Sequence, residues 1–495
     1  MAKYRNCSLL LLTFGLCFLA ISQRSEGYRL RSRSERSIQT VEGRERCEIR
    51  SLNAREPNHR VQHEAGVTEM WEQDNEQMQC ANVAAARHII EPNGLYLPNF
   101  HNAPMLAYIV QGNGILGTIM PGCPETYESF QQEGRRILGR RGRTERGQTM
   151  DDQHQKLHFF RQGDILALPA GVAHWWYNDG DANIVMVVMH DIGSHLNQLD
   201  QHLRKFYLAG NPGAQAQHTV SLRERRLAHN IGSNIFKGFD VELLAESFGV
   251  SLDTARQLQC ENDRRGSIVR VYEGLGVVRP PRTIRGRWIV NNSTTSTDNN
   301  EMMENGLEET FCSMRIRENI EDPERADVYT AVGGRISTIT SFDLPILQHI
   351  KLSAKRGYLY RNAMIAPQWN MNSHEIIYCI RGRARVQVVG SSSHNSRPLF
   401  DGELQEGQLL VIPQNFASLA MAGEEGFEWI TFMTSENAVS SSLSGRAAVM
   451  TALPEEVIMN MYMISRQDAR RLKYNRREMT ILSPRSTTRG IRAAA

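Results

Sequence analysis

The chain has 495 residues, 41% of them hydrophobic and 22% charged, which supports two or three domains with buried cores and excludes a disordered chain. Its 57 Lys and Arg residues nearly balance 54 Asp and Glu residues, and the net charge of +3 argues against nucleic acid as a partner. Seven of the basic residues are Lys and the other 50 are Arg, the side chain with the most nitrogen, a bias that suits a nitrogen reserve.

The N-terminus is predicted to be a secretion signal over residues 1–26. Lys3 and Arg5 form a basic start, and the apolar core that follows, from about residue 9 to residue 21, is too short to span a membrane. A basic segment occupies residues 27–44. Since no later stretch approaches a spanning length, we expect a soluble product of the secretory pathway with no membrane partner.

One strand–turn–strand unit occurs twice in the chain. Apolar residues alternate with polar ones in the second copy, where Ala384, Val386 and Val388 are separated by Arg385 and Gln387, the period of a strand with one wet face. We predict a half-buried hairpin in each copy. The two units cover residues 106–110, 111–114 and 115–120, and residues 375–380, 381–383 and 384–389.

A turn followed by a strand also occurs twice, at 163–169 and at 407–413. The turn glycines Gly112 and Gly382 are 270 positions apart, whereas Gly163 and Gly407 are 244 apart, so the first copy has an insertion of about 26 residues. We assign it to the polar, Arg-rich segment 131–155. The duplication predicts a mainly β protein of two tandem domains.

Each copy ends in a predicted helical tail. Residues 242–244 and 250–258 reappear as 456–458 and 464–472, and their apolar positions at helical spacing require a covering partner, for which a neighbouring subunit is one candidate. Between the copies, residues 291–304 are almost entirely polar and predict an exposed linker. Asn291 and Asn292 both begin glycosylation sequons.

Several separate motifs, in order along the chain, resemble the legumin-type 11S globulins, which are bicupin seed storage proteins. They are Asn305-Gly306-Leu307-Glu308-Glu309-Thr310-Phe311-Cys312, Pro121-Gly122-Cys123-Pro124-Glu125-Thr126-Tyr127 and Asp322-Pro323-Glu324-Arg325-Ala326-Asp327. The resemblance implies two tandem jelly-roll cupin β-barrels, each with a helical extension. In this chain we expect the first barrel with its helical tail over residues 45–265, a linker over 266–305 and the second barrel with its helical tail over 306–495.

The resemblance also implies cleavage between Asn305 and Gly306 by a vacuolar asparaginyl endopeptidase. Asn-Gly is otherwise a turn dipeptide, and it occurs again at Asn93 and at Asn113, but only Asn305 follows a long polar linker that a protease can extend. The family further implies a homo-oligomer, a trimer of the proprotein that becomes a hexamer when mature, carried from the endoplasmic reticulum to the protein storage vacuole.

The cysteine pairing is implied by the same resemblance. It joins Cys123 to Cys312 across the processing site and Cys47 to Cys80 within the first domain, and it leaves Cys260 and Cys379 unpaired. Spacing alone does not decide connectivity among these six cysteines, and none of them has the spacing of a zinc site.

Many cupin barrels are enzymes that bind a metal through three His and one Glu, so the equivalent positions are the candidate catalytic and metal residues. Counting from the repeated motifs places Gln368, Asn370, Glu375 and Ser418 there in the second copy, and Pro98, Phe100, Met105 and His174 in the first. One donor of that kind in four does not hold a divalent ion against water. We therefore expect no metal, no cofactor and no catalytic residue, and a storage role. The alternatives are a metal-dependent cupin oxidase or dioxygenase and a small-ligand-binding protein.

Overall fold

The computed structural model describes residues 49, 51–71, 75–123, 127–128, 153–212, 232–260, 262–277, 283–284, 287–288, 312–390 and 398–484. The signal and basic segments, most of 131–155, the sequons at Asn291 and Asn292, Cys47 and the Asn305–Gly306 bond lie outside these residues. Within the described part of the chain, no helix is both long and apolar enough to cross a membrane.

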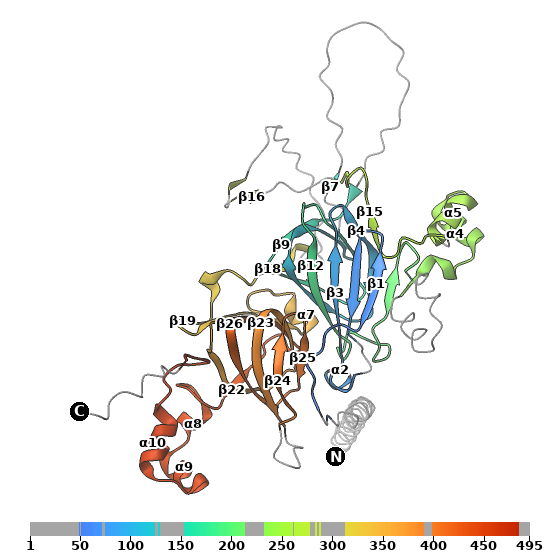
Figure 1. Ribbon diagram of the computed structural model, residues 1–495. Coiled ribbons are helices and arrows are strands. Elements are labelled where there is room, and N and C mark those ends of the chain that lie inside the picture. Colours follow the sequence, from blue (N-terminus) through green and yellow to red (C-terminus); the bar gives the residue numbers. More distant parts are fainter. Residues whose placement is uncertain are drawn as a thin grey trace, which may run out of the picture. The chain divides into compact units, whose positions relative to one another are not determined.

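The first copy forms two sheets that face each other as a barrel (Figure 1). One sheet has the order β1 (His59–His63), β2 (Gly66–Met70), β3 (Val83–Ile90), β12 (Ile184–Asp191), β5 (Met105–Gln111), β10 (Asp164–Leu168) and β18 (Arg317–Asn319). The other has the order β14 (Ser233–Asn234), β13 (Lys205–Tyr207), β4 (Gly94–His101), β11 (Ala173–Tyr177), β6 (Asn113–Ile119) and β9 (Leu157–Arg161), and β15 (Ile268–Arg270) pairs with β4. Helix α2 (Glu76–Ala81) precedes β3.

The second copy repeats this architecture with longer strands. Its central path is β19 (Val328–Thr330), β20 (Gly334–Ile339), β21 (Ser353–Leu359), β26 (Ala417–Met433), β22 (Met364–Asn370) and β27 (Ser440–Ser442). The long strand β23 (Glu375–Val389) pairs with β26, β24 (Phe400–Gln405) and β25 (Leu409–Ile412), and β28 (Ile481–Leu482) pairs with β22. Helix α7 (Leu347–Ile350) lies between β20 and β21 in sequence. Outside the two barrels, two-residue strands form two further pairs, β7 (Tyr127–Glu128) with β8 (Gln153–His154) and β16 (Thr283–Ile284) with β17 (Arg287–Trp288).

The repeated strand–turn–strand unit is a barrel corner, so the predicted hairpins are wrong. In the first copy, β5 and β6 lie in different sheets and do not pair with each other. In the second copy, β23 runs through the turn as one bent strand with shifts of register. Gly112 and Gly382 occupy these corners with φ values of 87° and 75°, where a Cβ would lie 2.7 Å and 2.3 Å from the backbone oxygens of Asn183 and Gly426. The glycines allow each chain to turn from one sheet into the other.

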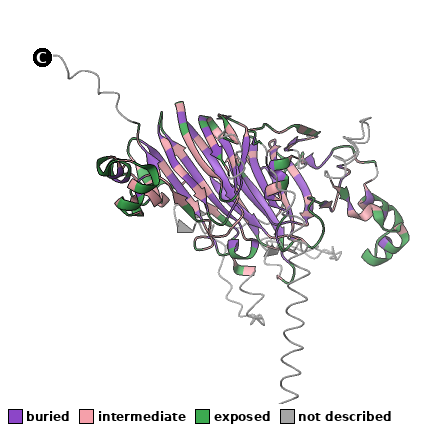
Figure 2. Ribbon diagram, turned by 90° about the horizontal axis from the view of Figure 1, so that it is seen from below, coloured by how far each residue is buried: buried purple, intermediate pink, exposed green. Residues whose placement is uncertain are grey.

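Burial follows the predicted strand periods. The two repeated turn-and-strand segments contain β10 and β25, and all residues of both strands are buried. In β23, Ala384, Val386 and Val388 are buried whereas Arg385 is exposed, which confirms the alternation. Figure 2 shows buried residues along the strands and exposed residues over the helices. The mainly β bicupin fold is therefore confirmed.

Both helical tails form pairs of helices, α4 (Val241–Phe248) with α5 (Leu252–Gln259) and α9 (Glu455–Tyr462) with α10 (Arg466–Tyr474), and α8 (Val449–Ala452) precedes the second pair. The copies share their caps: Ser251 and Ser465 each accept a hydrogen bond from the backbone N–H three residues later. Large apolar side chains stay exposed on both pairs, among them Leu243 at 68% and Leu472 at 51%.

The two barrels exchange segments. Strand β18 follows Asn305 in sequence, yet it pairs with β10 of the first barrel. Conversely, Arg55 at the start of the first barrel forms a β-bridge with Leu409 of the second. The region expected as a linker over 266–305 also begins with β15, which pairs with β4. Backbone hydrogen bonds therefore cross the boundary between the copies in both directions.

Candidate functional site

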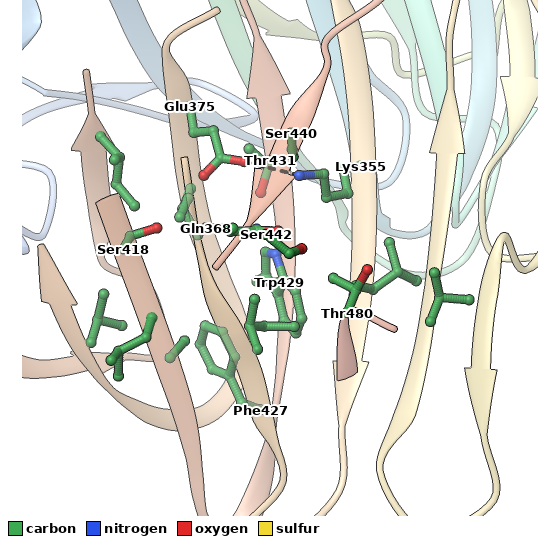
Figure 3. Close-up of a pocket in the computed structure, with 18 of the residues that line it drawn as sticks. Lys355, Gln368, Glu375, Ser418, Phe427, Trp429, Thr431, Ser440, Ser442 and Thr480 are labelled. Carbon is green, nitrogen blue, oxygen red and sulfur yellow. Dashed lines mark hydrogen bonds and ion pairs between the residues drawn. The ribbon is translucent and has the colours of Figure 1, made fainter. Parts of the chain in front are cut away.

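The four metal-equivalent residues of the second barrel do meet inside it. Strand β22 carries Gln368 and Asn370, β23 begins with Glu375, and Ser418 of β26 pairs in register with Gln368. Gln368, Glu375 and Ser418 line a cavity of about 190 Å³ (Figure 3). Counting from the repeated motifs thus identified a real common site.

The polar groups of this cavity are partly engaged with each other. Glu375 Oε1 lies 2.9 Å from Lys355 Nζ, and Ser440 donates a hydrogen bond of 2.6 Å to Asn370 Oδ1. Burial raises the pKa of Glu375, but Lys355 and a hydrogen bond from Asn370 outweigh it and hold the pKa below its usual value. The carboxylate is therefore ionised and already neutralised by an ammonium group, which does not suit a metal ligand.

In the first barrel the counting is wrong by one residue on β4. Asn99 and His101 are the buried residues facing inward, whereas Phe100 stacks on Phe206 at a centroid distance of 5.0 Å. Three residues separate His101 from Met105 in the first barrel, whereas four residues separate Asn370 from Glu375 in the second. The loop after β4 is therefore one residue shorter than the loop after β22. A shift of one residue along a strand exchanges its two faces, so the residues that point inward on β4 are the neighbours of those expected from the count. Pro98 and Phe100 are not the equivalent positions, while Met105 and His174 are buried as expected.

The inward-facing His101 belongs to a histidine cluster that the sequence motifs did not predict. The ring of His101 lies 4.8 Å from that of His174 and 4.6 Å from that of His190, measured between centroids. His88 and His63 join through Thr68, whose Oγ1 lies 3.0 Å from a ring nitrogen of each. The signal that could have found the cluster is the alternation of buried positions along β4, which places His101 on the same side as Asn99.

The histidine cluster is held neutral by burial. Burial lowers the pKa of His63 and of His174 to about 4, and it lowers those of the other three well below 6.5. Lys205 on β13 lies beside them, and burial lowers its pKa to about 8. Across the described residues, no group of three or more His, Cys, Asp or Glu side chains is arranged to hold a metal ion, so neither barrel fits the metal centre of cupin enzymes.

One disulfide links the sequences before and after the predicted processing site at Asn305. Cys123 and Cys312 form a disulfide with a Cα–Cα distance of 5.5 Å, and this is the pair that the resemblance implies. Cys80 is also disulfide-bonded; its implied partner Cys47 lies outside the described residues, and that pairing stays a prediction. Cys260 and Cys379 are free, and burial raises the pKa of Cys379 to about 12, so its thiol is inert.

A buried ionic network adds to this link. Arg356 of the second barrel is 2% exposed and donates to Tyr108 Oη of the first barrel at 3.2 Å. Tyr108 in turn donates to Glu321 Oε1 at 2.6 Å, and a second nitrogen of Arg356 lies 2.8 Å from Glu428. Disulfide, exchanged strands and this network together connect the sequences on either side of Asn305.

Comparison with known proteins agrees with this geometry. The family model described as Cupin matches residues 52–213 and 318–470. An 11S globulin seed storage protein of Carya illinoinensis is 47% identical, with 89% of this chain and 91% of that protein covered. Cocosin 1 of Cocos nucifera is 45% identical, with 97% and 98% covered.

A solved structure leads to the same family. The 11S globulin from Wrightia tinctoria, described as revealing an auxin binding site, superposes with a TM-score of 0.75 at 43% identity and covers 88% of this chain and 96% of its own. The duplicated barrels, the residues at their centres and the full-length similarity lead to one conclusion: the chain belongs to the 11S globulins, the legumin-type cupin seed storage proteins.

Proposed function

We propose that the protein is a nutrient reservoir without enzymatic activity, stored in the protein storage vacuole and degraded on germination. The observation that carries this proposal is the chemistry of the two barrel centres. One has a carboxylate neutralised by Lys355, and the other has neutral histidines packed ring against ring beside Lys205. Neither set offers the three His and one Glu of a cupin enzyme, and the Arg-rich composition supports storage of nitrogen.

Metal analysis of the purified protein tests this proposal against the alternative of an oxidase or dioxygenase. We expect less than a tenth of an equivalent of manganese, iron or copper per chain after extensive dialysis. One equivalent of bound metal, together with oxygen consumption on any substrate, contradicts the storage-only role.

The maturation pathway is part of the proposal. An asparaginyl endopeptidase cleaves after Asn305, and the disulfide between Cys123 and Cys312 retains both product chains. We expect the exposed apolar faces of α4–α5 and α9–α10 to be covered by neighbouring copies in a trimer of the proprotein and then a hexamer. Sedimentation of wild type and Asn305→Gln after protease treatment tests this order, and hexamers formed by the uncut variant contradict it.

A second candidate function is the binding of a small organic molecule, which the cavity of the second barrel favours. The auxin site described for the Wrightia tinctoria relative makes indole-3-acetate one molecule to test. Equilibrium dialysis of indole-3-acetate against the full-length protein tests whether it binds. Ligand binding and storage are compatible functions of one protein.

A further inference from the structure

The two barrels differ in how their interiors are filled. In the first barrel, Trp176, Tyr96 and Tyr207 are buried together with the histidine cluster, and the void lined by His63, Lys205 and their neighbours is only about 10 Å³. In the second barrel, the cavity is about 190 Å³. An apolar cavity of about 150 Å³ is known to bind benzene, so the second cavity has room for one aromatic ring and a few further atoms.

The wall of the cavity is suited to such a ring. Phe427 and Trp429 on β26 stack at a centroid distance of 4.8 Å and both line the space (Figure 3). Ile365, Ile377 and Leu404 add aliphatic surface around them. Such a lining favours a flat apolar ligand, because aromatic contacts combine large buried area with defined geometry.

Polar groups without partners face the same space. Gln368 is 9% exposed and Thr431 is 1% exposed, and neither side chain has a hydrogen-bond partner among the described residues. A carboxamide supplies donors and an acceptor, and a hydroxyl supplies both, so these groups match an alcohol or an amide. Buried polar groups are normally paired with protein groups or with water, so these two side chains are available to a ligand that enters the cavity.

The charges of the cavity select against an ionic ligand. Lys355 and Glu375 are 14% and 6% exposed and neutralise each other. Because the two charges cancel, neither residue can neutralise a charged ligand. A bound anion would give the largely buried site a net negative charge, and a bound cation would give it a net positive charge, and both are unfavourable.

We propose that the second barrel binds one neutral single-ring aromatic alcohol or amide per chain, with its ring against Phe427 and Trp429 and its polar group on Gln368 and Thr431. This inference rests on the second candidate function above and adds the class of ligand.

Calorimetric titration of the full-length protein with a matched set of compounds tests it. 2-Phenylethanol and phenylacetate share the ring and the two-carbon chain but end in a neutral hydroxyl and an ionised carboxylate, respectively, and ethylbenzene has no polar end. We expect one saturable site per chain for 2-phenylethanol and at least tenfold weaker binding of phenylacetate. Replacement Gln368→Met, which keeps the length of the side chain but removes its hydrogen bonds, should weaken 2-phenylethanol binding about five- to tenfold and leave ethylbenzene binding unchanged.

Two further variants keep the test independent of folding defects. Gln348→Met makes the same substitution at an exposed position of helix α7, outside the lining of the cavity, and should not change any affinity. Ala420→Leu adds volume on the same face of β26 as Ser418 and should abolish binding of both 2-phenylethanol and ethylbenzene.

The outcomes separate the ligand class from ligand binding itself. Tighter binding of phenylacetate or indole-3-acetate than of 2-phenylethanol overturns the neutral class but keeps the candidate function. Equal weakening of 2-phenylethanol and ethylbenzene by Gln368→Met also overturns the proposed contact. No saturable binding of any of these compounds by the wild type overturns both.

Discussion

Acidification should destabilise the first barrel selectively, because burial keeps its histidine cluster neutral at acidic pH values where exposed histidines are protonated. The folded-state pKa of His63 and of His174 is about 4, below the ordinary value of 6.5, so the unfolded state binds protons first as the pH falls. The stability that each provides is complete above pH 6.5 and is lost as the pH falls from 6.5 towards 4. At ~1.4 kcal/mol per pKa unit, each of these two histidines contributes about 3 kcal/mol over that range.

Other groups determine the net effect. His88, His101 and His190 act in the same direction, because burial lowers the pKa of each well below 6.5. Asp191 acts in the opposite direction: burial raises its pKa to about 7, so the folded state takes up this proton first and gains roughly 4 kcal/mol between pH 7 and pH 4. Lys205, with a pKa of about 8, is already charged throughout this range and adds no further dependence. Five histidines against one carboxyl group leave a net loss of stability in acid.

Hydrogen exchange read by mass spectrometry measures this directly. After correction for the intrinsic rates, lowering the pH from 7 to 4.5 should increase exchange in β4, β11 and β12, while β21 and β26 of the second barrel serve as the internal reference. His174→Gln, which cannot titrate, should reduce the acid-induced loss of stability by about 2–3 kcal/mol. His195→Gln on an exposed loop of the same barrel is the matched control. Equal acid sensitivity of the two barrels, or an unchanged pH profile in His174→Gln, refutes the reasoning.

Three other predictions concern the links within and between the barrels. Cleaved wild type should run as one species on a gel without reductant and as two with it, whereas cleaved Cys312→Ser should show two bands in both lanes; a single band for that variant contradicts the link. Arg356→Met removes the buried cation shared by Glu428 and Glu321, although Tyr108 still donates to Glu321, and it should lower the free energy of unfolding in urea by about 3 kcal/mol. Arg361→Met at the exposed pair with Glu424 should change that free energy by less than about 0.5 kcal/mol. Gly382→Ala places a Cβ 2.3 Å from the Gly426 oxygen and should reduce the melting temperature more than Gly249→Ala, where φ is also positive but no atom lies within 4 Å; equal effects would show that backbone conformation alone matters.

Local patterns predicted much of the fold and part of the site. The repeated turn-and-strand segments identified β10 and β25, alternation identified the second half of β23, and apolar residues at helical spacing identified the helical tails that contain α5 and α10. In the second barrel, where the loop between β22 and β23 has the expected length, counting also reached the cavity residues Gln368 and Glu375.

Other features depend on which segments meet in space. The same glycine turn that predicts a hairpin acts as a barrel corner, because the partners of β5 and β6 come from distant parts of the chain. One missing residue after His101 turns the opposite face of β4 inward and assembles a histidine cluster from strands far apart in sequence. The periodicity of neighbouring residues does not predict which distant strands pair or which distant side chains meet.

The duplication, the strand and helix periods and the family are evident from the amino-acid sequence alone, because each depends on residues that are close together in the chain or on motifs in a fixed order. Folding, by contrast, brings β18 to the first barrel, buries Arg356 between the copies, and leaves a cavity of about 190 Å³ in the second barrel, whereas histidine rings pack against each other in the first. The physical reason is that packing volume and hydrogen-bond pairing are properties of side chains brought together by folding, and two copies with the same period fill their interiors differently.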